Sequence, residues 1–223
     1  MKKQLPLMLI FILTIFISFS QEKSAEGKIK YTPAFKFKDG IFLNFQQVKN
    51  NSPIPKSQIM TTIDYNAFDF YDKLLDNKYI TIYDNLGVQK KIDVEKIWGF
   101  SDKGILYINI NDEFNRIPVF GSISHFIANK TFQEYDPYRY QYQNSRYYYN
   151  DPYTTKTVMI QYILDFETGK IYEFNVNSVE KILIKDPELY EEFSKLSNRK
   201  KKKLKFVYIR KYNQKHPVYF PKN

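Results

Sequence analysis

The segment around the first of two histidines contains side chains of the kinds that perform nucleophilic catalysis. Residues 121–125 read Gly-Ser-Ile-Ser-His. A serine hydroxyl becomes a strong nucleophile when a histidine takes its proton, which requires the two side chains to lie within hydrogen-bonding reach. In a strand, Ser124 and His125 point to opposite faces, and the segment lacks the Gly-x-Ser-x-Gly turn of serine hydrolases. We therefore predict no catalytic residue here.

The sequence contains no clear pattern for binding a metal or a cofactor. The chain has no cysteine, which excludes disulfides, thiolate metal sites and a cysteine nucleophile. His216 precedes Pro217 after a cationic segment, where we expect a C-cap or packing role, because a zinc site would need His125 and further ligands close by. No phosphate-binding loop, dinucleotide pattern or EF-hand spacing occurs. We predict no metal and no cofactor.

Carboxylates are plentiful, so a hydrolase that uses a pair of them stays open as an alternative. The sequence does not say which two would face each other across a cleft. The candidates are Asp64, Asp69, Asp72, Asp112, Glu113, Glu191 and Glu192.

A run of cations near the C-terminus is the least random feature of the sequence. Residues 199–215 hold nine basic side chains and no acid. Such a run is commonly a solvated helix face, but it also suits a polyanion such as anionic lipid headgroups or an acidic glycan. Nucleic acid fits the charge equally well, but the export signal described below disfavours it. The candidate polyanion-binding residues are Arg199, Lys200, Lys201, Lys202, Lys203 and Lys205.

A second unusual segment, residues 134–153, is rich in tyrosine. It contains eight of the chain's twenty tyrosines and no aliphatic side chain that could anchor a core, so we expect a surface loop. Tyrosine with arginine and asparagine is typical of protein-binding surfaces, and a disordered insertion is the alternative. The candidate partner-binding residues are Tyr138, Arg139, Tyr140, Tyr142, Arg146, Tyr147, Tyr148 and Tyr149.

The first twenty residues predict export. Two lysines precede an uncharged apolar run, residues 7–19, which is shorter than the roughly 20 residues of a spanning helix. Ser18 and Ser20 supply the small side chains of a cleavage site before Gln21. We expect a signal peptide at residues 1–20 and a soluble periplasmic or extracellular protein without a transmembrane span. A retained membrane anchor is the alternative.

Turn residues predict the elements that position these side chains. Asp-Gly and similar pairs between β-branched or aromatic runs favour hairpins. The expected hairpins cover residues 35–43, 79–92, 97–108 and 158–174, and the expected short helices begin after Asn44, near Phe70 and after Asn177. Asp186 before Pro187 suits the N-cap of a longer helix. A second helix starting near Ser197 would place five cations against the helix dipole, so we favour one helix over two for residues 187–213.

The composition fits a globular chain, since 43% of its 223 residues are hydrophobic and 26% charged. We expect an α+β fold: one hairpin-rich antiparallel domain over residues 21–223, with a basic C-terminal helical segment, 186–216, forming a long helix or a helix pair. The apolar side chains that should pack this segment on the sheets are Leu189, Phe193, Leu196, Leu204 and Tyr208.

Three segments resemble an uncharacterised family of exported Bacteroidetes proteins: DGIFLNFQQVKNN at 39–51, IWGF at 97–100 and YIRKYNQKHP at 208–217. The resemblance implies export but no reaction, so it assigns no functional residue.

We expect a non-enzymatic envelope protein that binds or scaffolds an unknown ligand, with an anionic envelope surface or an envelope protein as partner. The alternatives are electrostatic attachment to an anionic membrane or glycan through the basic helix, and the carboxylate hydrolase. The oligomeric state stays open.

Overall fold

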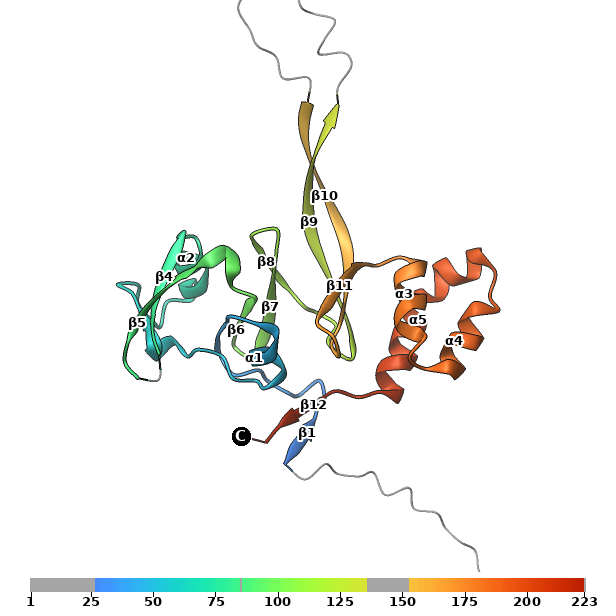
Figure 1. The fold of residues 1–223 in the computed structure, drawn as a ribbon, viewed down its shortest axis with the longest axis horizontal. Coiled ribbons are helices and arrows are strands. Elements are labelled where there is room, and N and C mark those ends of the chain that lie inside the picture. The colour runs from blue at the N-terminus through green and yellow to red at the C-terminus, as the bar shows by residue number, and fades with distance from the viewer. Residues whose placement is uncertain (1–26, 85, 136–152, 223) are drawn as a thin grey trace, which may run out of the picture.

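The structure is a computed structural model that describes residues 27–84, 86–135 and 153–222. It confirms the α+β fold class, and every strand pairing among these residues is antiparallel. Figure 1 shows a central body with a small β lobe on one side, a helical unit on the other and a long β ribbon that rises between them. The predicted signal peptide lies outside the described residues.

The strands form four sheets. A four-stranded sheet has the order β2 (Gly40–Phe42), β6 (Gly99–Asp102), β7 (Ile105–Ile110) and β8 (Glu113–Arg116). One three-stranded sheet contains β11 (Lys170–Glu173), β10 (Tyr153–Asp165) and β9 (Ile123–Tyr135). The other contains β3 (Ile59–Met60), β4 (Tyr79–Tyr83) and β5 (Gln89–Asp93). A two-stranded sheet pairs β1 (Lys28–Lys30) with β12 (Tyr219–Pro221).

The α-helices among the described residues are α1 (Phe45–Lys49), α2 (Phe70–Leu75), α3 (Val176–Leu183), α4 (Pro187–Ser194) and α5 (Asn198–Lys215). Single 3₁₀ turns lie at Lys56–Gln58 and Val94–Lys96. The predicted caps of α1 and α4 are confirmed, because Asn44 accepts a hydrogen bond from the Gln47 N–H and Asp186 accepts one from the Leu189 N–H. The predicted start of α3 is two residues late, since Asn175 rather than Asn177 is its N-cap.

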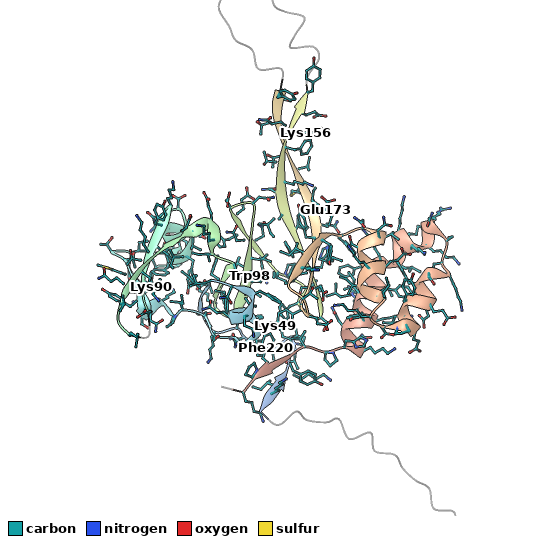
Figure 2. All side chains as sticks on the ribbon, in the orientation of Figure 1. Lys49, Lys90, Trp98, Lys156, Glu173 and Phe220 are labelled. Atoms are coloured by element: carbon teal, nitrogen blue, oxygen red, sulfur yellow. The ribbon has the colours of Figure 1, made fainter. Side chains whose placement is uncertain are left out.

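The β2–β6–β7–β8 sheet and the β11–β10–β9 sheet divide the buried side chains into three clusters, because neighbouring residues of a strand point to opposite faces. In β2, Ile41 packs with α2 and β4 whereas Phe42 packs in the central cluster. In β10, Ile163 packs against the helices whereas Leu164 packs in the central cluster. The sheet that contains β2 therefore joins the central body to the small β lobe, and the sheet that contains β10 joins it to the helical unit. Phe220 of β12 is fully buried in the central cluster (Figure 2).

Three of the four predicted hairpins are confirmed, as β4–β5, β6–β7 and β10–β11. The hairpin predicted at residues 35–43 is wrong. Only its second half is a strand, and that strand pairs with β6 on one side and with Ile54 on the other. The Asp39 carboxylate instead accepts a hydrogen bond from the Gly104 N–H at 2.9 Å, so the Asp-Gly pair meets a distant turn.

The preference for one C-terminal helix is also wrong, because the segment 187–213 forms two helices. α4 ends at Ser194 and α5 begins after its N-cap Ser197. The reversal brings the rings of Phe193 and Tyr208 within 4.8 Å of each other, centroid to centroid, and both are buried. Burying the two rings contributes roughly 3–6 kcal/mol, which is enough to offset the roughly 1.5–5 kcal/mol that five nearby cations cost at a helix N-terminus.

The predicted packing of this segment is confirmed. Leu189, Phe193 and Tyr208 are buried in the helical cluster, and Leu196 and Leu204 pack against it.

The ribbon consists of β9 and β10, which pair from Ile123 and Asp165 at its base to Tyr135 and Tyr153 at its outer end. It is stabilised on its surface by an ion pair of 3.0 Å between Lys156 and Glu134 (Figure 2).

The Tyr-rich segment was expected to be a loop throughout, but its described residues 134, 135 and 153 belong to these strands. The candidate partner-binding residues lie outside the described residues: Tyr138, Arg139, Tyr140, Tyr142, Arg146, Tyr147, Tyr148 and Tyr149.

Candidate functional site

The geometry of α5 divides the basic run between two faces of the helix. Residues advance by about 100° each around an α-helix. Lys201 and Lys205 therefore lie on the side of α5 that carries the buried Tyr208 and Tyr212. The other four of the six candidate cations lie outside this face, around the rest of the helix surface, and are exposed. We call them the basic tip. The basic tip consists of Arg199, Lys200, Lys202 and Lys203.

The two inward lysines hold α5 against its neighbours. The Lys201 ammonium lies 2.6 Å from the Glu180 carboxylate of α3. Lys205 donates to the Phe174 carbonyl at 2.6 Å and lies 3.8 Å from the centroid of its ring. Burial lowers the pKa of Lys205. Both lysines therefore have structural partners, and four of the six predicted polyanion-binding residues remain for a ligand.

The four side chains of the basic tip make no hydrogen bond or ion pair with any other described residue. Lys211 and Lys215, near the other end of α5, do have such partners. Lys211 pairs with Glu192 at 2.6 Å. Lys215 pairs with Asp186 at 2.9 Å and with Glu188 at 2.6 Å. Asp186 and two acids of α4 thus compensate Lys211 and Lys215, whereas the N-terminal end of α5 stays positive.

The N-terminus of α5 adds to this positive potential. Ser197 is the N-cap, but its side chain makes no capping hydrogen bond, and the first turn contains no acid. The aligned peptide dipoles of a helix place about half a positive charge at this end. Cations in the first turn are therefore unfavourable for the helix, and an anion bound beside them would offset the repulsion.

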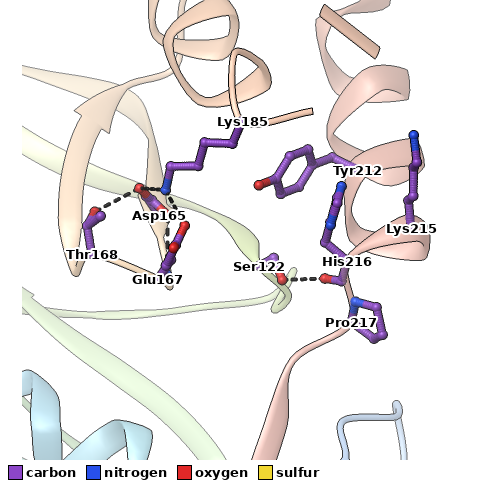
Figure 3. A pocket seen from close by; sticks show the side chains of 9 residues that line it. All are labelled: Ser122, Asp165, Glu167, Thr168, Lys185, Tyr212, Lys215, His216 and Pro217. Atoms are coloured by element: carbon purple, nitrogen blue, oxygen red, sulfur yellow. Dashed lines mark hydrogen bonds and ion pairs between the residues drawn. The ribbon is translucent and has the colours of Figure 1, made fainter. Parts of the chain in front are cut away.

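A pocket of about 660 Å³ lies between the β10–β11 turn, the chain before β9 and the C-terminal end of α5 (Figure 3). Its charged groups are paired with one another. Lys185 bridges Asp165 at 2.8 Å and Glu167 at 2.6 Å. Burial opposes the charge of Lys185, but the two carboxylates outweigh it and raise the pKa of this lysine. The lining residues are Ser122, Asp165, Glu167, Thr168, Lys185, Tyr212, Lys215, His216 and Pro217.

Asp186 connects the two ends of the helical unit beside this pocket. Its carboxylate caps α4 and contacts the Lys215 ammonium at 2.9 Å and the His216 Nε2 at 2.6 Å. Burial would raise the pKa of Asp186, but these hydrogen bonds lower it to about 2. His216 is the C-cap of α5, the role predicted for it, and its carbonyl accepts a hydrogen bond from the Ser122 hydroxyl. The pocket therefore holds the helices on the sheet.

Ser124 and His125 have separate hydrogen-bond partners in the structure. The Ser124 hydroxyl is buried and donates to the Gly121 carbonyl at 2.9 Å. The His125 ring contacts the Gln161 amide oxygen at 3.2 Å, and burial lowers the pKa of His125. Among the described residues, no group of three or more histidine, aspartate or glutamate side chains could hold a metal ion.

The carboxylates of the hydrolase alternative are spread over the molecule. Asp69, Glu191 and Glu192 form ion pairs with neighbouring lysines. Asp72 and Asp112 line two different pockets. These five carboxylates therefore do not share a site.

Comparison with family models, with curated proteins and with solved structures finds no match for this chain. The resemblance to exported Bacteroidetes proteins therefore stays a prediction. None of the helices in the described part of the chain is both long and apolar enough to span a membrane.

Proposed function

We propose that the protein is exported and acts as a non-enzymatic binding module of the cell envelope, attached to an anionic membrane surface through the basic tip. The observation that carries the proposal is the set of four exposed cations at the N-terminal end of α5 that have no hydrogen-bond or ion-pair partner among the described residues. The predicted signal peptide at residues 1–20 supports an envelope location.

The chemistry of the basic tip favours a surface with many equivalent anions. Three of its four side chains are lysines, which act as point charges without a fixed hydrogen-bonding geometry. Val207 lies on the same side of α5, with 44% of its surface exposed, and offers an apolar contact beside the charges. Each lysine or arginine close to an anionic bilayer contributes about 1 kcal/mol to binding at low salt. Lipid headgroups meet these requirements.

The proposal is tested by co-sedimentation of the chain from Gln21 with vesicles of phosphatidylglycerol and phosphatidylcholine, and with vesicles of phosphatidylcholine alone. We expect binding only to the anionic vesicles. Changing all four residues of the basic tip to glutamine should weaken this binding about 1,000-fold at low salt, because about 1 kcal/mol is lost for each of the four charges. Raising the salt to about 1 M should release the unchanged protein, because the Debye length falls to about 3 Å.

A matched control variant replaces four exposed lysines that lie outside α5. Their side chains have no ion pair or hydrogen bond within the described part of the chain. The control changes Lys28, Lys38, Lys170 and Lys222 to glutamine. It should bind the anionic vesicles within about 10-fold of the unchanged protein, because these lysines contribute only to the net charge. Equal losses in the two variants, or binding that persists without the basic tip, would contradict the proposal.

A further inference from the structure

A second pocket combines aromatic walls with cations. It has a volume of about 320 Å³ and is formed by the segment after β1, the β6–β7 turn and the segment after β8. None of its residues belongs to the helical unit. Among the described residues that line it, four are aromatic, two are prolines and three are cations, and none is a carboxylate. These residues are Tyr31, Phe35, Phe37, Phe120, Pro33, Pro118, Lys36, Lys103 and Arg116.

Ring contacts fix the aromatic part of this pocket. Phe37 is buried, and its ring meets that of Phe120 edge-on at 5.1 Å between centroids. Tyr31 lies 4.7 Å from Phe120, measured in the same way. The backbone is tied as well, since the Phe37 N–H donates to the Gly104 carbonyl at 3.3 Å. The pocket is therefore formed before a ligand arrives, which limits the entropy cost of binding.

The cations of the pocket are largely uncompensated. The side chains of Arg116 and Lys36 are exposed and make no ion pair or hydrogen bond with the rest of the described chain. Lys103 has only a distant partner, the Asp102 carboxylate at 3.9 Å. The pocket thus places a guanidinium and two ammonium groups around aromatic and proline side chains.

We infer that this pocket binds one sugar-acid residue of an acidic glycan. The sugar ring has an apolar C–H face that fits against aromatic rings such as those of Tyr31 and Phe35, and its carboxylate matches the planar guanidinium of Arg116. Inorganic phosphate has no apolar face for these rings, and a neutral sugar has no charge for Arg116 and Lys36. Pro33 and Pro118 are exposed, so the pocket opens to solvent.

The inference is tested by isothermal titration calorimetry with the trisaccharide of galacturonic acid and with the matching neutral trisaccharide of galactose, at about 0.15 M salt. The acidic trisaccharide should bind at least 10-fold more tightly than the neutral one and than inorganic phosphate. Arg116→Gln should lower the affinity for the acidic trisaccharide about 10- to 100-fold, because a charge-assisted hydrogen-bond pair is lost. Tyr31→Leu keeps much of the buried volume, removes a ring face and should lower that affinity as well.

The variant of the basic tip serves as the control, because it removes four charges elsewhere and should leave this affinity unchanged. The outcome is thereby independent of the proposed membrane attachment. Arg116 is exposed, so its substitution should leave the fold intact even if Tyr31→Leu does not. Equal affinity for the neutral trisaccharide or for phosphate, full affinity in Arg116→Gln, or no binding at millimolar trisaccharide would overturn the inference.

Discussion

At the scale of single residues, the buried carboxylate of Asp186 joins the start of α4 to the end of α5 through its contacts with Lys215 and His216. Asp186→Asn keeps a good N-cap for α4 but removes the charge that faces Lys215 and His216. We expect the free energy of unfolding to fall by roughly 2–4 kcal/mol, measured by urea denaturation at pH 7. Asp112→Asn is the control, because Asp112 is exposed and asparagine tolerates its φ of 66°. A loss no larger than that of the control would contradict this role.

The same carboxylate predicts a dependence of stability on pH. The pKa of Asp186 in the folded protein, about 2, lies below its ordinary value of 3.8. Ionised Asp186 therefore stabilises the fold fully above about pH 4, and this contribution is lost as the pH falls through 2. The difference in stability between the unchanged protein and Asp186→Asn should narrow over this range in urea titrations. A constant difference would show that the ionised carboxylate is not the cause.

At the scale of elements, the close approach of two strands depends on a glycine. A Cβ atom at Gly99 of β6 would lie 2.1 Å from the Tyr107 carbonyl oxygen of β7, so the strands would have to separate. We expect Gly99→Ala to cost roughly 2–3 kcal/mol of unfolding free energy. Gly87→Ala should cost only about 1 kcal/mol, because the site is open and only the φ of +77° is unfavourable. Thermal or urea denaturation of both variants tests this, and the reverse order would contradict it.

The start of α5 should show a conflict between stability and binding. Lys200→Glu places a glutamate three residues after the N-cap Ser197, which creates a capping box and favours the helix dipole. We expect unfolding free energy to rise by about 0.5–1 kcal/mol while binding to anionic vesicles weakens. Lys222→Glu makes the same charge change away from α5 and should do neither. A less stable Lys200→Glu variant would contradict this account of the helix start.

Local sequence signals predicted those elements whose partners lie nearby in the chain. The Asn44 and Asp186 caps and three hairpins depend on residues a few positions apart, and the structure confirms them. The Asp39-Gly40 pair gave a wrong hairpin because its partners lie in β6 and at Ile54, far along the chain. The division of the C-terminal segment into two helices likewise depends on tertiary burial of Phe193 and Tyr208, which outweighs the local charge repulsion.

At the scale of the whole molecule, the sequence shows the run of cations but not which of its side chains have structural partners. The run of cations was visible from composition alone. That Lys201 and Lys205 are held by Glu180 and Phe174 was not, because these contacts join residues 21 and 31 positions apart. The aromatic pocket was equally hidden, since its walls come from three separated segments that only the packed sheets bring together.

Export of the whole protein and its electrostatic attachment to the envelope can be tested in one experiment. The most direct measurement separates the envelope of cells that express the protein, washes it with about 1 M salt, and determines the mass of the released chain. We expect an envelope-bound protein that begins at Gln21 and is released by the salt wash. A chain that begins at Met1 and stays in the membrane pellet, or a protein that is soluble before any salt is added, would contradict it.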